Sequence, residues 1–237
     1  MSRSMEAGLE RIREGAAPGA HTVKVFDRDL DDLRAAMCEM GGRVEVAIGG
    51  AMAALRNRDV DGAAAIVGDG ARITAMAEEI ERRAVGIIAT RAPVADDLRA
   101  VVAALRMAGL AERMGGCALN IARRVDALSG CAEVGHLRLI PELERRVLEM
   151  VKAALDAFAA RDPVAAAQVI ARDDEVDALY AAVFRALVEH MTRHHSSITS
   201  GTHLLFVAQK LERIGDHAAA MARIVRFAAT GSYAEEE

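Results

Sequence analysis

Apolar residues recur at every third or fourth position along most of the chain, which is the spacing of one face of an α-helix. The C-terminal part shows the pattern most clearly, at Leu204, Val207, Leu211, Ile214, Ala218, Met221, Val225 and Ala228. An earlier segment repeats it at Met107, Ala111, Met114, Ala118, Ile121, Val125 and Leu128. Alternating steps of three and four are typical of a helix packed along its length in a left-handed bundle.

The prolines mark the helix boundaries. Pro93, Pro141 and Pro163 each precede a long helical pattern, and Asp162 before Pro163 is a typical N-cap followed by a proline in the first turn. The periodicity predicts six long helices, at residues 27–57, 60–90, 94–128, 141–161, 163–194 and 198–229. The pattern is interrupted at 129–135, which separates two groups of three helices.

The two groups of helices resemble each other in sequence. Residues 107–118 align with 207–218 at an offset of 100 residues, and 55–60 align with 158–163 at an offset of 103. We therefore expect an all-α fold made of two tandem repeated three-helix bundles. The expected boundaries are an N-terminal tail at 1–20, a first repeat at 21–129, a linker at 130–140, a second repeat at 141–230 and a C-terminal tail at 231–237.

Composition excludes several classes of protein. With 52% hydrophobic and 27% charged residues, the chain is too apolar for a disordered protein and too charged for a membrane protein. A net charge of −5 argues against binding to nucleic acid, which favours basic surfaces. No uncharged apolar run is long enough to insert into a membrane. The three cysteines form no CxxC pair, so they fit small buried residues in a reducing cytoplasm.

Two pairs of acidic residues in the second repeat suggest a metal site. Asp173 and Asp177 lie four residues apart in one predicted helix, and Glu212 and Asp216 in another, so each pair shares a helix face. Four carboxylates that converge beside a core seam need a cation, and oxygen ligands suit iron, manganese, magnesium or calcium. Ordinary surface charge is the alternative. His217 is a candidate extra ligand, or else a histidine at the edge of the core.

The first repeat retains little of this pattern. At the two offsets, Gly70 and Thr74 correspond to Asp173 and Asp177, while Glu112 and Gly116 correspond to Glu212 and Asp216. Glu112 alone keeps its carboxylate, so we expect one good site and one degenerate one. Asp69 replaces a missing ligand only if the helix shifts by one residue.

Sequence motifs of catalysis are missing. The chain has no nucleophile elbow, Walker loop, zinc-protease motif or dinucleotide-binding motif, and we expect it not to be an enzyme. A ferritin-like di-metal protein would carry a Glu-x-x-His pair, whereas Gly215 stands three residues after Glu212. That class and a metal-free helical scaffold, in which the carboxylates only form ion pairs, remain the alternatives.

The segment 211–217, LERIGDH, resembles the hallmark motif of the PhoU family, and 110–116 is similar to a degenerate copy of it. Further similarity lies at 21–41, 93–99 and 157–162, so the resemblance extends over roughly 21–229. It implies two tandem three-helix bundles in a cytoplasmic, usually homodimeric protein without catalytic activity.

The same resemblance implies a function and a ligand. PhoU-like proteins regulate phosphate uptake and repress the phosphate-starvation response, the Pho regulon, when phosphate is plentiful. They are thought to connect the ATPase subunit of the phosphate ABC transporter to a sensor histidine kinase with a PAS domain. Their acidic motifs bind iron, zinc or related metals, which here implies metal ligation by Asp173, Asp177, Glu212 and Asp216.

Overall fold

The computed structural model describes residues 18–131 and 139–232, and the described part is helical with no strand. The helices are α2 (Pro18–Asn57), α3 (Val60–Arg91), α4 (Ala95–Ser129), α5 (Leu139–Ala160), α6 (Pro163–Ile170), α7 (Asp173–Arg193) and α8 (Ile198–Thr230), with a short 3₁₀ turn η1 (His195–Ser197) before α8. The predicted all-α fold of two three-helix repeats is confirmed. The tail residues 1–17 and 233–237 and the linker residues 132–138 lie outside the described residues.

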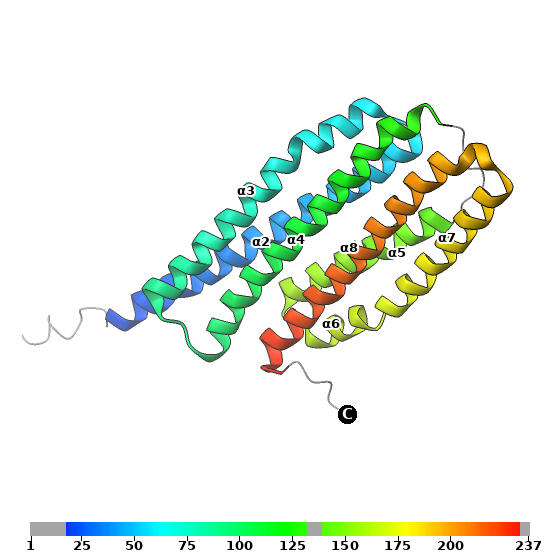
Figure 1. The fold of residues 1–237 in the computed structure, drawn as a ribbon. Helices are drawn as coiled ribbons and strands as arrows, with labels where there is room; N and C mark the ends of the chain where they lie inside the picture. Colours follow the sequence, from blue (N-terminus) through cyan, green and yellow to red (C-terminus); the bar gives the residue numbers. More distant parts are fainter. Residues whose placement is uncertain (1–17, 132–138, 233–237) are drawn as a thin grey trace, which may run out of the picture.

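The two bundles lie side by side and form an elongated body (Figure 1). Helices α2, α3 and α4 pack together in one bundle, and α5, α6, α7 and α8 pack in the other. The bundles meet where α4 packs against α8 and α2 against α5. Leu155 of α5 rests directly on Gly41 of α2, and Arg56 of α2 forms an ion pair with the buried Glu144 of α5. One continuous core therefore joins the two repeats.

The predicted core stripes are buried. The α4 stripe lies inside along its whole length, and the α8 stripe does so except at its two ends, Leu204 and Ala228, which are partly buried. The methionines of these stripes, Met107, Met114 and Met221, are fully enclosed. Each Å² of apolar surface that is buried stabilises the fold by about 25 cal/mol, so these seams are the main source of stability.

The turn between the first and second helices is the same in both repeats. Arg58 and Arg161 each adopt a left-handed backbone with φ of 54°. The carboxylate of Asp59 accepts a hydrogen bond from the amide of Gly62 at 2.9 Å, and Asp162 accepts from the amides of Val164 and Ala165 at 2.8 and 3.0 Å. The offset of 103 residues read from the sequence therefore holds in three dimensions.

A glycine on the third helix of each repeat admits an apolar side chain from the second. A Cβ on Gly115 would lie 3.0 Å from Ile73, and a Cβ on Gly215 would lie 3.1 Å from Val176. The two glycines are related by the offset of 100 and their two partners by the offset of 103. Both offsets thus describe one packing arrangement, repeated twice.

The prediction of one helix at 163–194 is wrong, because the chain turns at Ala171 and Arg172 and forms α6 and α7. The amide of Arg172 donates to the carbonyl of Val169 at 3.1 Å, which is the tighter spacing of a 3₁₀ turn. Residues 173–175 are all acidic and form the first turn of α7, where negative charge is favoured by the helix dipole. In the first repeat α3 is continuous.

Two other helices begin earlier than predicted. Helix α2 begins at Pro18 rather than at residue 27, and α5 begins at Leu139 rather than at Pro141. A proline is tolerated in a first turn because its missing N–H has no partner there in any case. In the described part of the chain, no helix is long and apolar enough to cross a membrane.

Candidate metal centre

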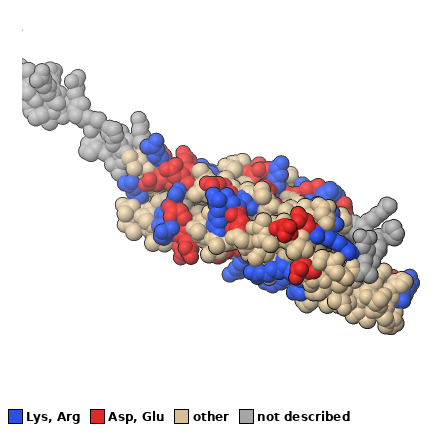
Figure 2. All heavy atoms as spheres, turned by 90° about the horizontal axis from the view of Figure 1, so that it is seen from above, with Lys and Arg blue, Asp and Glu red and all other residues tan. Residues whose placement is uncertain are grey.

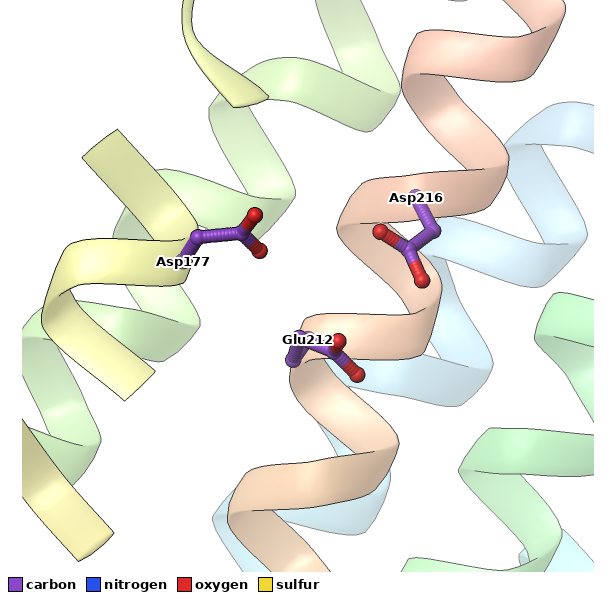
Figure 3. Close-up of side chains that lie close together, drawn as sticks. All are labelled: Asp177, Glu212 and Asp216. Atoms are coloured by element: carbon purple, nitrogen blue, oxygen red, sulfur yellow. The ribbon is translucent and has the colours of Figure 1, made fainter. Parts of the chain in front are cut away.

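Three of the four predicted ligands come together between α7 and α8. One carboxylate oxygen from each of Asp177, Glu212 and Asp216 lies within 4.8 Å of the other two. Asp177 extends from α7 toward α8, on which Glu212 and Asp216 lie one turn apart (Figure 3). Glu212 is half-buried, whereas Asp177 and Asp216 are exposed. The site is thus a shallow cluster of oxygen ligands open to solvent.

The close approach of α7 and α8 at Gly215 positions this cluster. Val176 packs against the bare backbone of Gly215, so the helices meet at the level of the site. Asp177 follows Val176, and Asp216 follows Gly215. The small residue in the acidic motif therefore sets the distance between the two ligand-bearing helices.

Asp173 lies one turn before Asp177 and forms an ion pair with an arginine instead of joining the group. Its Oδ2 accepts a hydrogen bond from Nη2 of Arg223 at 3.3 Å, and its side chain is 19% exposed. Its Oδ1 is buried and has no hydrogen-bond partner among the described residues. A buried carboxylate oxygen without a donor is costly, so this atom fits a cation as its missing partner.

The sequence patterns do not single out Arg223, which pairs with Asp173 beside this cluster. Its position seven residues after Asp216 is two turns along α8 and gives it the same helix face. That spacing is the signal by which a basic neighbour of the acidic motif can be found.

Burial, together with mutual repulsion, makes the cluster hard to ionise completely. Burial raises the pKa of Glu212, and the charges of Asp216 and Asp177 raise it further against the opposing effect of Arg213. Burial also raises the pKa of Asp173, and Asp216 adds to the effect while Arg223 opposes it. These are the changes expected of carboxylates assembled to receive a positive ion.

The raised pKa values predict how stability depends on pH. An ionised Glu212 destabilises the metal-free fold, and this penalty is absent below its usual pKa of 4.5 and appears as the pH rises through the raised value. We expect Glu212→Gln to raise the Tm of the metal-free protein at pH 7 by about 1 °C, because like charges one helical turn apart cost a few tenths of a kcal/mol.

The measurement is thermal unfolding in a chelator at low salt between pH 4.5 and 7. The difference in Tm between variant and wild type should grow with pH. The exposed Glu81→Gln on α3 controls for the loss of one negative charge. A difference that is the same at both ends of the pH range would contradict the explanation.

His217 does not belong to the three-residue group. The side chain is half-buried, and burial lowers its pKa, with further lowering by the charges of Arg213 and Arg113 against the effect of Asp216. Arg113 lies on α4, so the ring of His217 experiences the charges of the α4–α8 seam. A neutral imidazole is the form that binds metals, yet the structure does not place this one within the carboxylate group.

The first repeat lacks an equivalent group among the described residues. Glu112 is half-buried on α4 and belongs to no group of three or more potential ligands among the described residues. A Cβ on Gly70 would lie 2.2 Å from Leu119, so an apolar side chain fills the space that a counterpart of Asp173 would need. Asp69 is exposed and pairs with Arg43 of α2 at 2.8 Å. It therefore faces α2 and does not replace a ligand.

The fold and the site together define a class of protein: a helical protein of two fused three-helix bundles, with a carboxylate cluster on the second bundle. Comparison with protein families identifies the PhoU domain twice, at residues 37–125 and 140–225. The two matches coincide with the two bundles. The chain therefore belongs to the PhoU family.

Individual relatives agree with this assignment. The chain is 46% identical over 216 residues to the phosphate-specific transport system accessory protein PhoU homolog of Zymomonas mobilis, covering 91% of both proteins. It is 41% identical over 212 residues to the homolog of Caulobacter vibrioides, covering 89% of this chain and 92% of the relative.

Solved structures agree as well. The crystal structure of PhoU from Pseudomonas aeruginosa superimposes with a TM-score of 0.83 at 32% identity, covering 87% of this chain and 100% of the other. PhoU from Streptococcus pneumoniae gives a TM-score of 0.81 over 89% of this chain, and at 24% identity it supports the fold alone.

Proposed function

We propose that this protein regulates phosphate uptake and represses the phosphate-starvation response, the Pho regulon, when phosphate is plentiful. The observation that carries the proposal is the doubled PhoU domain, shared over most of its length with relatives named as accessory proteins of phosphate-specific transport. The protein acts by binding and not by catalysis. Its effect on a partner is a shift in the population of that partner's conformations.

The proposed partners are the ATPase subunit of the phosphate ABC transporter, a sensor histidine kinase with a PAS domain, and a second copy of this chain in a homodimer, all at the cytoplasmic side. A rigid body suits such an adaptor, and the continuous core across α4 and α8 supports rigidity. On the face shown in Figure 2, acidic and basic side chains are intermixed. Mixed charge favours selective contacts with protein surfaces.

We further propose that Asp173, Asp177, Glu212 and Asp216 hold a metal ion, with iron or zinc as the first candidates and manganese or magnesium as others. A bound cation supplies the positive charge that offsets the clustered carboxylates and fixes α7 to α8. The three grouped ligands contain no histidine, which counts against a ferritin-like centre. The ion pair of Asp173 with Arg223 is the observation that favours a metal-free scaffold.

Deletion of the gene in its own host tests the regulatory role. We expect alkaline phosphatase to be expressed in high phosphate after deletion, and to be repressed again when the wild-type gene is restored. Normal repression in a strain with no second gene of this family would contradict the proposal. Complementing the deletion strain with a gene for Asp216→Asn shows whether repression depends on the acidic cluster.

A further inference from the structure

A groove of about 320 Å³ runs along the seam of α4 and α8, beside the carboxylate cluster. Its lining is Arg106, Gly109, Leu110, Arg113, Ala220, Arg223 and Ile224. The three arginines come from both helices, and none of these lining residues is acidic. Figure 1 shows α4 and α8 next to each other at the centre of the molecule, so the groove lies between the two repeats.

The groove has the chemistry of an anion site. Arginine presents several N–H donors in one plane, which match two oxygens of a phosphate at once. Three arginines that line one concave surface concentrate positive potential there. The groove is open beside Gly109, because a Cβ there would meet nothing within 4 Å. We propose that this groove binds a small oxyanion of the phosphate class.

Arg223 connects this groove to the carboxylate cluster. Arg223 lines the groove, and its guanidinium donates to Asp173 at 3.3 Å. When a metal ion neutralises the carboxylates, Arg223 is no longer needed as their counter-ion and its charge is available to an anion. The oxyanion and the metal therefore bind with positive coupling, and by linkage each raises the affinity of the other equally. This coupling rests on the proposed metal site, whereas anion binding does not.

Titration calorimetry of the full, chelator-treated chain with inorganic phosphate at low chloride tests the site. We expect saturable binding at one site per chain. The double variant Arg106→Gln/Arg113→Gln should bind about tenfold more weakly or worse, because two charge-assisted contacts are lost. Arg82→Gln, an exposed arginine on α3 that pairs with Glu79, is the matched control and should bind as the wild type does.

A second variant keeps every charge and fills the groove. Gly109→Leu introduces a side chain where the Cβ has open space, so the helix accepts it and the anion is excluded. Loss of phosphate binding in this variant supports the groove even where the double arginine variant is unstable. Wild-type protein that binds no phosphate saturably, or Arg82→Gln that loses as much affinity as the double variant, would overturn the proposal.

Two further titrations define the source of the anion and the coupling. Glycerol 3-phosphate that binds more tightly than inorganic phosphate would assign the site to an organic phosphate, and the reverse order would assign it to the free ion. With Mn²⁺ present, phosphate affinity should rise about fivefold or more. Glu212→Gln/Asp216→Asn corrects for association of Mn²⁺ with phosphate in solution. Phosphate binding without Mn²⁺ binding would leave the anion site standing and exclude manganese as the coupled metal. Mn²⁺ binding without phosphate binding would remove only the anion site.

Discussion

Asp216→Asn is expected to abolish stable metal binding while leaving the fold intact. Asp216 is one of the three grouped carboxylates, and after burial its charge is the main cause that raises the pKa of both Glu212 and Asp173. Asparagine has nearly the same shape, and position 216 is exposed, so the change removes a charged ligand without disturbing the core. Since loss of even an outer-shell partner costs 10–100-fold in metal affinity, loss of this ligand should cost about 100-fold or more.

Elemental analysis after loading with Fe²⁺, Zn²⁺ or Mn²⁺ and dialysis measures this effect. Thermal unfolding gives an independent reading, because a ligand at about 100 times its Kd stabilises the native state by about 2.7 kcal/mol. The wild type should gain this stabilisation and Asp216→Asn should not. Glu112→Gln removes the corresponding type of residue from the first repeat and should behave as the wild type. Equal metal content in all three proteins would exclude the assigned site.

The helices and their buried faces could be predicted because a helix repeats its contacts every 3.6 residues. Alternating steps of three and four in α4 and α8 identify the residues that the structure buries, including Met114 and Ile214. The repeat could also be predicted, because each copy needs the same turn chemistry at Asp59 and Asp162. Local rules of helix periodicity and capping were sufficient for these features.

The break between α6 and α7 could not be predicted, because neither Ala171 nor Arg172 is a helix-breaking residue. Both adopt right-handed helical dihedral angles, with φ and ψ of −65° and −17° at Ala171 and −86° and −9° at Arg172. The helices on both sides of this turn pack against α8, and the first turn of α7 is acidic. Tertiary contacts here override a helical propensity that extends through the whole segment.

Which of the carboxylates come together could also be learned only from the structure. Spacing places Asp173 and Asp177 on one face of α7, but their positions along α8 decide which of them joins Glu212 and Asp216. Val176 packed against Gly215 places the adjacent Asp177 at the level of that pair. Asp173 forms an ion pair with Arg223, a partner that no acidic motif predicts.

Restoring the lost carboxylates should create a second metal site in the first repeat. Thr74 and Gly116 stand at the counterparts of Asp177 and Asp216, and Glu112 already stands at the counterpart of Glu212. Thr74 is exposed, and a Cβ on Gly116 would meet nothing within 4 Å, so both positions accept aspartate. Ile73 against Gly115 holds α3 and α4 as closely as Val176 against Gly215 holds α7 and α8. We therefore expect Thr74→Asp/Gly116→Asp to double the metal content per chain.

The most decisive version of this experiment introduces Thr74→Asp and Gly116→Asp into the Asp216→Asn variant. Any metal then retained after dialysis belongs to the new site, and we expect the binding lost through Asp216 to return. Thr74→Asn/Gly116→Asn in the same background is the neutral control and should bind none. Adding Gly70→Asp should not help, because its Cβ would collide with Leu119 at 2.2 Å and overpacking of this kind costs about 1–3 kcal/mol. If the two aspartates bind no metal in a folded protein, the approach of two helices at a glycine is not sufficient to build the site. The difference between the repeats then lies in Asp173, whose unpartnered oxygen would be the ligand that the first repeat lacks.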